Sequence, residues 1–450
     1  MVPSPNRHEG GPPHSAPRAR CLRWGGLPLL WLLVTSRGAA QDLRAGIDSW
    51  AETISELSAP KWTGPRVPFP ESQPRPKAIG SLSSFQAPLR VHAGRGTDPH
   101  RLGAVLEQAE ATLALLAQTG ILDLPVDAGG GGSFERDLYL VADANQAADA
   151  QIDASQTTGA LDGAHAFALV DARLPADRLW ACTAHALIEA RLFELDPAES
   201  SRVRKASAGY FAELVAGEPC MAEGREGPAR DQGGSTAPLG VDPLLGWLEA
   251  LSARQDQNRG VFLAMMWQFC RQHTWEGDGL RASPHLLEAI EHALGFSHES
   301  LDQIAPELAR QEAQSQMKRG QDELWPTLDA ARFPARLPPF SPPLDALETR
   351  HLLVELSSPK PGAHLSIWSR GEYGVRWALS ATLLDEDDQP QRVVSAPVRK
   401  LPKSELHIDL GPKATRVLVS LTNLGDGTPQ LLPEDETFLR TAQLTFALTP

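Results

Sequence analysis

The apolar positions of the chain follow two different repeats, and the change between them falls near residue 340. Before that point, apolar residues recur every three to four positions, as in helices with one buried face. This spacing predicts helices over residues 99–119, 178–195, 198–216, 243–273, 283–294 and 301–317. Short apolar runs between these helices predict strands at residues 88–92, 138–141 and 166–170.

The last hundred residues alternate apolar and polar positions with a period of two, and turn residues such as Pro361-Gly362 separate the short runs. This alternation predicts strands at residues 351–356, 364–368, 375–384, 405–410, 416–422 and 442–448. A series of short strands without a helical segment is typical of an antiparallel β-sandwich. The fold class predicted for the whole chain is therefore α+β.

Proline-rich segments suggest where the domains meet. Six prolines lie between Pro60 and Pro76, and five lie between Phe333 and Leu344. Such segments are typical of linkers. The predicted organisation is a leader, an arm with a linker, a domain of strands and helices, a second linker and a β-sandwich, at residues 1–40, 41–87, 88–332, 333–346 and 347–450.

The first forty residues have the layout of a secretory signal peptide. Arg18, Arg20 and Arg23 precede an apolar run from Trp24 to Val34, and small residues follow up to Ala40. This order predicts export to the periplasm or the outside, with cleavage near Ala40. The alternative is a buried or interfacial apolar segment. The apolar run is shorter than the roughly 20 residues that span a bilayer, so the cleaved chain is not expected to cross a membrane.

The charge of the chain excludes one class of partner. With 42 Lys and Arg against 56 Asp and Glu, the net charge is −14, and loss of the basic leader makes it more negative. Binding to nucleic acid needs clustered basic residues, so no nucleic-acid partner is expected.

Three cysteines remain after the leader. Cys182 and Cys220 bracket two predicted helices and are the best candidates for a disulfide, which an oxidising compartment permits. Cys270 lies in an apolar helical run and is expected to be a buried free thiol. The alternative is that all three are unpaired core residues.

The same two helices carry the residues that point to chemistry. In the first, His185 and Glu189 are four positions apart and therefore share one helix face. The second helix contains the run from Ala206 to Glu213. The order strand, helix, strand, strand, helix, helix over residues 88–217 resembles the core of zinc metallopeptidases of the gluzincin type.

In that family one helix carries His-Glu-x-x-His, whose two histidines bind zinc and whose Glu is the general base, and the next helix supplies a third ligand, Glu. In this chain His185 matches the first ligand, Ala186 replaces the base, Glu189 replaces the second His, and Ala208 replaces the third ligand. The whole layout also resembles secreted myxobacterial proteins of metalloprotease type with a C-terminal β-sandwich, through residues 368–375 and 421–425.

The resemblance implies a pseudopeptidase: a secreted or periplasmic protein without catalytic residues or a bound cofactor, which binds a protein or a glycan or has a structural role in the envelope. The alternative is an active zinc metallopeptidase or metallohydrolase in which His185, Glu189 and Glu213 are substitute ligands. A third interpretation is a surface ion pair between His185 and Glu189 that stabilises its helix slightly.

Other candidate sites have simpler explanations. A metal site around His285, His292 and His298, with Glu288 and Glu291, competes with a solvated helix face. The acidic run 385–388 suggests calcium but is more typical of a hairpin turn. Trp368 and Trp377 suggest a carbohydrate platform, although packing in the core is favoured.

Overall fold

The computed structural model describes residues 66–67, 71–119, 132, 134–142, 147–157, 164–218, 220, 243–257, 260–270, 280–281, 286–296, 299–318, 325–341, 343–344, 346–356, 362–400, 402–411, 413–425 and 440–449. All of them belong to one compact unit, residues 55–450. The predicted leader lies outside the described residues. A short ladder pairs β1 (Arg66–Val67) with β7 (Leu280–Arg281).

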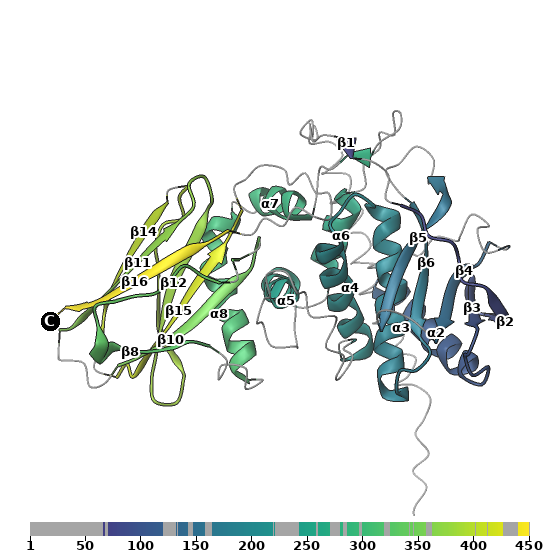
Figure 1. Cartoon of the computed structure of the whole chain (residues 1–450), viewed down its shortest axis with the longest axis horizontal. Helices are drawn as coiled ribbons and strands as arrows, with labels where there is room; N and C mark the ends of the chain where they lie inside the picture. Colours follow the sequence, from purple (N-terminus) through teal and green to yellow (C-terminus); the bar gives the residue numbers. More distant parts are fainter. Residues whose placement is uncertain are drawn as a thin grey trace, which may run out of the picture. The chain divides into compact units, whose positions relative to one another are not determined.

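The first part of the described chain forms a five-stranded mixed sheet (Figure 1), whose strands lie in the order β2-β3-β4-β6-β5. The bounds are β2 Ala78–Ser83, β3 Leu89–Gly94, β4 Arg136–Val141, β5 Ala148–Thr157 and β6 Ala164–Asp171. The three central strands are parallel and the two edge strands antiparallel. The central strands confirm the three predicted ones, whereas β2 and β5 were not predicted because few of their residues are apolar.

Two helices cover one face of this sheet: α2 (Arg101–Thr119) and α3 (Ala176–Leu195). Alternate residues of a strand point to opposite faces, so one set of strand residues packs under the helices. Val91, Leu138 and Val170 belong to this set and are fully buried. The opposite face carries a small aromatic cluster of Tyr139, Phe167 and Leu169.

The far side of α3 packs against a second apolar core, formed by α4 (Ser201–Ala216), α5 (Pro243–Asp256), α6 (Val261–Cys270), α7 (Leu286–Phe296) and α8 (Leu301–Lys318). Local signals fix the ends of α4: Ser200 caps its first turn, and Gly217 ends it at a φ of 77°. The predicted helices at 178–195, 198–216 and 301–317 are confirmed to within three residues.

The single helix predicted over residues 243–273 is wrong, because the chain breaks into α5 and α6. Gln257 and Gly260 have φ angles of 59° and 72°, which a helix cannot contain. Asp256 stabilises the break, since its Oδ2 accepts a hydrogen bond from the backbone amide of Phe262 at 2.7 Å. The carboxylate thereby caps the first turn of α6.

The C-terminal part consists of two sheets around one apolar core (Figure 1), with strand orders β13-β12-β15-β10-β8 and β14-β11-β16-β9. The bounds are β8 Thr327–Asp329, β9 Ala335–Arg336, β10 Thr349–Glu355, β11 His364–Gly371, β12 Trp377–Leu384, β13 Pro390–Ser395, β14 Lys403–Asp409, β15 Arg416–Asn423 and β16 Ala442–Thr449. We call this part the two-sheet region. It contains all six strands predicted beyond residue 347, and β13 is additional.

The segment predicted as a linker at 333–346 contributes to the two-sheet region. β9 pairs with β16, and β8, which precedes the segment, pairs in parallel with β10. Phe333, Leu337 and Phe340 pack against the apolar core between the sheets. Pro334 and Pro338 lie just outside the two-residue strand β9, so they remove no amide proton from its pairing with β16.

A disulfide joins Cys182 on α3 to Cys220, four residues beyond the end of α4, as the sequence predicted. It closes a loop that contains the α3–α4 hairpin. Cys270 is a buried free thiol, also as predicted. Among the described helices, none combines the length and the apolar character needed to cross a bilayer.

Replacing both Cys182 and Cys220 by serine should lower the free energy of unfolding by about 2–4 kcal/mol, because the unfolded chain regains the freedom of the opened loop. Urea unfolding of the oxidised protein and of the variant measures this difference. The Cys270 thiol should stay unreactive toward iodoacetamide in the folded protein, since burial raises its pKa. Equal stability of the two proteins would contradict the expectation.

Candidate functional site

The α3–α4 hairpin brings His185 of α3 close to α4. A Cβ atom added to Gly209 would lie 4.0 Å from His185 Cε1, so the two helices approach closely at this level. Small residues permit the approach, because Ala206, Ser207 and Ala208 precede this glycine on α4. The His185 side chain is 14% exposed and lies in the seam between the helices.

Glu189 lies one helical turn further along α3 and is completely buried. Its Oε2 is 3.9 Å from His185 Nε2, and its Oε1 is 3.9 Å from Nε of Arg204 on α4. Neither carboxylate oxygen accepts a side-chain hydrogen bond from the described residues. The His185 imidazole and the Arg204 guanidinium therefore lie within ion-pair distance of Glu189 without a hydrogen bond to it.

Burial changes the proton affinity of both side chains. It raises the pKa of Glu189 from 4.5 to about 7, with Asp149 adding to the rise, while Lys205, Arg204 and the backbone of Ala150 act against it. Burial likewise lowers the pKa of His185 from 6.5 to about 4, with help from Lys205. At neutral pH His185 is thus uncharged and Glu189 is divided between its two protonation states.

Ala186 and Ala208, which the resemblance predicts at the base and third-ligand positions, are both fully buried, in different cores. Ala186 packs in the core between the sheet and the helices, and Ala208 packs in the core of the helices. Neither side chain has a group that takes up a proton or donates an electron pair to a metal.

The structure brings together two of the three substitute ligands. His185 and Glu189 are neighbours, whereas no contact joins Glu213 to either of them among the described residues. Within the same part of the chain, no group of three or more His, Cys, Asp or Glu side chains is arranged to hold a metal ion. Whether the chain binds zinc through these substitute ligands or binds no metal therefore stays a prediction in either case.

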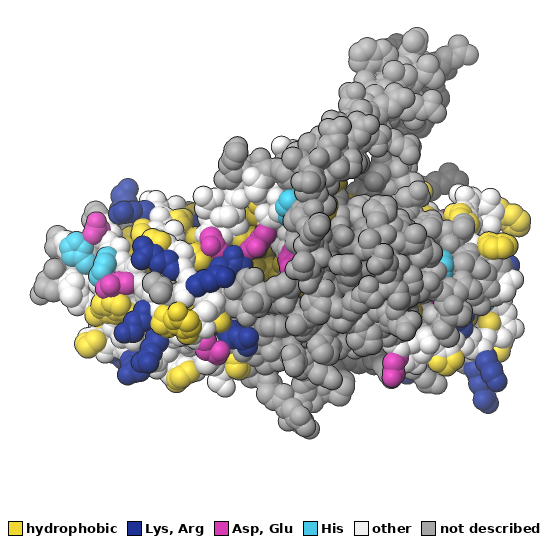
Figure 2. Space-filling model, turned by 90° about the horizontal axis from the view of Figure 1, so that it is seen from above, with side chains coloured by type: hydrophobic (Ala, Val, Ile, Leu, Met, Phe, Trp, Pro, Cys, Tyr) yellow, Lys and Arg dark blue, Asp and Glu magenta, His cyan; other side chains and the backbone are white. Residues whose placement is uncertain are grey.

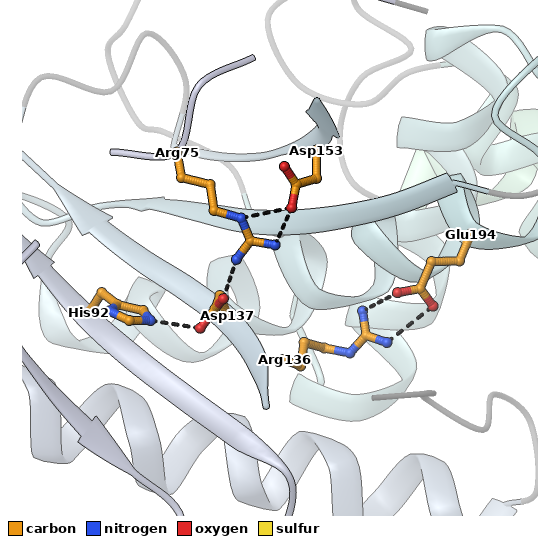
Figure 3. Close-up of polar contacts among 6 residues, drawn as sticks. All are labelled: Arg75, His92, Arg136, Asp137, Asp153 and Glu194. Carbon is orange, nitrogen blue, oxygen red and sulfur yellow. Dashed lines mark hydrogen bonds and ion pairs between the residues drawn. The ribbon is translucent and has the colours of Figure 1, made fainter. Parts of the chain in front are cut away.

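A second polar cluster, which no sequence pattern predicted, lies on the face of the sheet opposite α2 and α3 (Figure 3). Asp137 of β4 is fully buried, and its Oδ1 lies 2.7 Å from His92 Nε2 on β3. Arg75 contacts the other oxygen of Asp137, and its Nη2 donates to Asp153 Oδ2 on β5 at 2.7 Å. The guanidinium group also lies over the Phe167 ring, 5.3 Å from its centre.

Arg75 belongs to the segment that enters β2, and this segment crosses the sheet. The backbone amide of Gln73 donates to the carbonyl of Ile152 on β5, while the chain reaches the opposite edge strand at Ala78. Arg75 sits between these ends and links the carboxylates of two strands. It therefore clamps the segment onto the aromatic face of the sheet.

His92 and Asp137 have the geometry of an acid–base pair, but their surroundings favour a structural role. His92 is 6% exposed and stacks on the Tyr139 ring at 4.5 Å, and both oxygens of Asp137 are engaged. Ser81 of β2 lies opposite His92 in the sheet, but no hydrogen bond joins the two side chains among the described residues. The carboxylate of Asp137 offsets the charge of Arg75, and His92 contacts its remaining oxygen.

A third buried ion pair lies on the helix-covered face of β4. Nη1 of Arg136 donates to Glu194 Oε1 on α3 at 2.7 Å, and Nη1 of Arg191 donates to Glu194 Oε2 at 3.0 Å (Figure 3 shows the first pair). Adjacent residues of β4, Arg136 and Asp137, thus take part in separate networks on opposite faces of one strand.

The weaker candidates resolve in different ways. His292 stacks on Phe269 and Glu291 pairs with Arg376, while His285 and His298 lie outside the described residues. The acidic run 385–388 forms the turn between β12 and β13, as expected, since Asp385 Oδ1 accepts the backbone amide of Gln389 at 2.8 Å. Trp377 is a core residue, as favoured, but Trp368 is half-buried on the outer face of a sheet.

Comparisons with known proteins supply no family. No family model matches the chain, and no curated protein does. One similar structure is the enzymatically active domain of tailspike protein 4 from bacteriophage CBA120, with 12% identity over 24% of this chain and 15% of that domain, and a TM-score of 0.17. Another, from Sulfurospirillum deleyianum, has 9% identity over 25% of this chain and 98% of that one, and a TM-score of 0.16. TmCBM61, solved with β-1,4-galactotriose, has 17% identity over 25% of this chain and 68% of that one, and a TM-score of 0.17. TM-scores this low support neither a fold nor a function for this chain.

The pKa of Glu189 gives a test by pH. In the unfolded chain Glu189 loses its proton near pH 4.5, but the folded protein keeps it to about pH 7, so stability falls as the pH rises through this window. Glu189→Gln removes this loss and should stabilise the protein by up to about 3 kcal/mol at pH 8, with little effect at pH 5. Thermal unfolding at both pH values measures the difference.

The matched control is Glu213→Gln on the same hairpin, where the side chain is partly exposed and the same substitution removes no buried carboxyl group. His185 titrates in the opposite sense, losing stability as the pH falls from 6.5 to about 4, and it is present in all three proteins. The comparison is the stability of Glu189→Gln minus that of the parent. A smaller difference at pH 8 than at pH 5 would refute the assignment.

Removing the clamp should be costly. Arg75→Ala leaves the carboxylates of Asp137 and Asp153 buried without their cation, so the free energy of unfolding should fall by about 3–5 kcal/mol. The control is Arg90→Ala, which breaks a more exposed pair with Glu135 and should cost less than about 1 kcal/mol. Urea unfolding compares the two, and equal losses would disprove the clamp.

Proposed function

We propose that the chain is a non-catalytic relative of gluzincin-type zinc metallopeptidases that serves as a binding or structural protein outside the cytoplasm. Ala186 carries the proposal: the position of the general base is an alanine that is fully buried in the core beside the sheet. The observed order β3, α2, β4, β5, β6, α3, α4 supports the kinship, because it matches the family's order with one extra strand.

Peptide hydrolysis at a zinc ion needs three protein ligands, an open metal position and a base that takes a proton from water. His185 and Glu189 supply two donors 3.9 Å apart. Loss of the base alone typically lowers the rate by a factor of about 10²–10⁴. The residues of the hairpin thus favour a chain that keeps the architecture of a peptidase without its chemistry.

Export is part of the proposal. Its support is the leader pattern in residues 1–40 together with the Cys182–Cys220 disulfide, since disulfides persist mainly in oxidising compartments. The two-sheet region, which we interpret as a β-sandwich, offers exposed sheet faces for a partner.

An active zinc metallohydrolase with His185, Glu189 and Glu213 as ligands is the second candidate. One observation favours it: the His185 and Glu189 side chains approach each other from successive turns of one helix. In that case Glu213 would have to move toward them when a metal binds.

Metal analysis separates the two functions. After equilibration with micromolar zinc and removal of free metal, the purified protein should retain far less than one zinc per chain and cleave no peptide, because a third ligand and a base are missing. Elemental analysis and a peptidase assay check both expectations. Retention of about one zinc per chain, lost with the activity in His185→Ala but kept in the control His100→Ala, would overturn the proposal.

A further inference from the structure

The outer face of the four-stranded sheet β14-β11-β16-β9 presents its side chains in ordered rows. Residues of neighbouring strands lie directly opposite each other, so each row runs across the strands. The apolar residues of these strands point inward to the core between the two sheets. What remains outside is a flat polar surface, and we call it the outer face.

One row of the outer face is cationic. Lys403 on β14 lies opposite Arg370 on β11, and Arg370 lies opposite Gln443 on β16. Arg336 on β9 lies opposite Thr445, one row further along, but its side chain reaches this row, since its Nε and Nη2 donate to Gln443 Oε1 at 3.0 and 2.7 Å. Two positive charges therefore stand side by side, and Gln443 separates them from a third.

These charges have no acidic counterpart within the described part of the chain. Like charges placed directly opposite each other destabilise a sheet, so the Lys403–Arg370 pair costs stability rather than adding to it. All three cations are exposed. Lys400, also exposed, lies two residues before Pro402. The carbonyl of Pro402 accepts a hydrogen bond from the backbone amide of Gly371. A protein with a net charge of −14 thus keeps an unneutralised basic row on one surface.

The next row presents an aromatic ring. Trp368 lies two positions before Arg370 on β11, about 7 Å along the same face. Its Nε1 donates to Glu405 Oε1 on β14 at 2.5 Å, and the same carboxylate oxygen lies 3.1 Å from His407 Nε2. Ser366 holds the other nitrogen of His407 at 2.8 Å. This chain of contacts fixes the indole before any ligand arrives.

The two rings form a corner. The Trp368 and His407 planes are nearly perpendicular, at 89°, with their centres 6.4 Å apart. Further along the strands, His364 Nδ1 lies 2.6 Å from Asp409 Oδ1, and both side chains are about half-exposed or more. Basic, acidic and histidine side chains gather at this end of the molecule, on the left of Figure 2.

We propose that the outer face binds an acidic polysaccharide, with a sugar ring stacked on Trp368 and its carboxylate or sulfate groups paired with Arg370, Lys403 and Arg336. Such a ligand carries one anion per sugar, at intervals comparable with the strand spacing of about 4.8 Å. Guanidinium groups pair with planar anions through two parallel hydrogen bonds. Sugar hydroxyls donate hydrogen bonds to the carboxylate of Glu405, and the imidazoles of His407 and His364 donate to hydroxyls or accept from them.

The mixture of groups favours a glycan over a nucleic acid. A phosphodiester backbone is bound by many basic residues, and its affinity comes largely from their number. Here the carboxylates of Glu405 and Asp409 share the face with three cations. These two carboxylates would repel a continuous polyanion that offers them no hydroxyl groups to bind. The inference deepens the binding role of the proposed function, but it does not depend on kinship with metallopeptidases.

Titration calorimetry of the full protein with an oligogalacturonate tests the proposal. Arg370→Glu with Lys403→Glu should weaken binding at least about tenfold, since two ion pairs become repulsive. The matched control, Arg392→Glu with Lys413→Glu, makes the same change in charge at two exposed positions of the same region and should stay within about twofold. Trp368→Ala should weaken binding several-fold, and thermal unfolding confirms that each variant is folded.

Two further ligands complete the test. The methyl-esterified oligogalacturonate should bind much more weakly, because it keeps the sugar rings and loses the charges. A single-stranded DNA oligonucleotide of equal charge should bind more weakly than the oligogalacturonate.

Four results would overturn the inference: no binding to the parent protein, equal losses in the two double variants, no effect of Trp368→Ala, or equal affinity for DNA. Bound zinc with peptidase activity would overturn the proposed function instead and leave the glycan site standing.

Discussion

Helix α3 is enclosed on both sides, and the first half of the structure depends on that burial. Fifteen of its twenty residues are buried, because one side packs on the sheet and the other on the remaining helices. Polar side chains on such a helix must find partners inside the protein. Glu194 has two arginines, Arg136 and Arg191, whereas Glu189 has Arg204 at 3.9 Å without a hydrogen bond, and burial raises its pKa to about 7.

The same enclosure limits what chemistry the hairpin can perform. A hydrolytic site needs water next to its base and metal, so the helix that carries them has to face a cleft. In this protein the seam between α3 and α4 is lined by small residues such as Gly209, which let the helices close on each other. The buried alanines at positions 186 and 208 add to the packing of a hairpin that the Cys182–Cys220 disulfide also ties.

The apolar periodicity predicted the helices and strands that local sequence determines, but not the contacts that depend on residues far apart in the chain. The apolar repeats located α2, α3, α4 and α8 as well as the central strands, and the cysteine positions predicted the disulfide. The sequence did not predict the edge strands β5 and β13, because they are largely polar and each pairs with only one neighbouring strand. The break at Gln257 interrupts no apolar pattern, and Arg75 meets its partners only through the folded sheet, 62 and 78 residues away. At the candidate site, the sequence placed His185 and Glu189 on one face, but burial, which sets their charge, follows from tertiary packing.

The position of the disulfide in the chain has a consequence for assembly. Both cysteines precede α5 and the whole two-sheet region, so every atom needed to close the hairpin covalently is made before the second half of the protein exists. An oxidising environment can therefore secure α3 against α4 while later segments are still being synthesised. In such an environment the remaining helices would dock onto a hairpin whose ends are already tied.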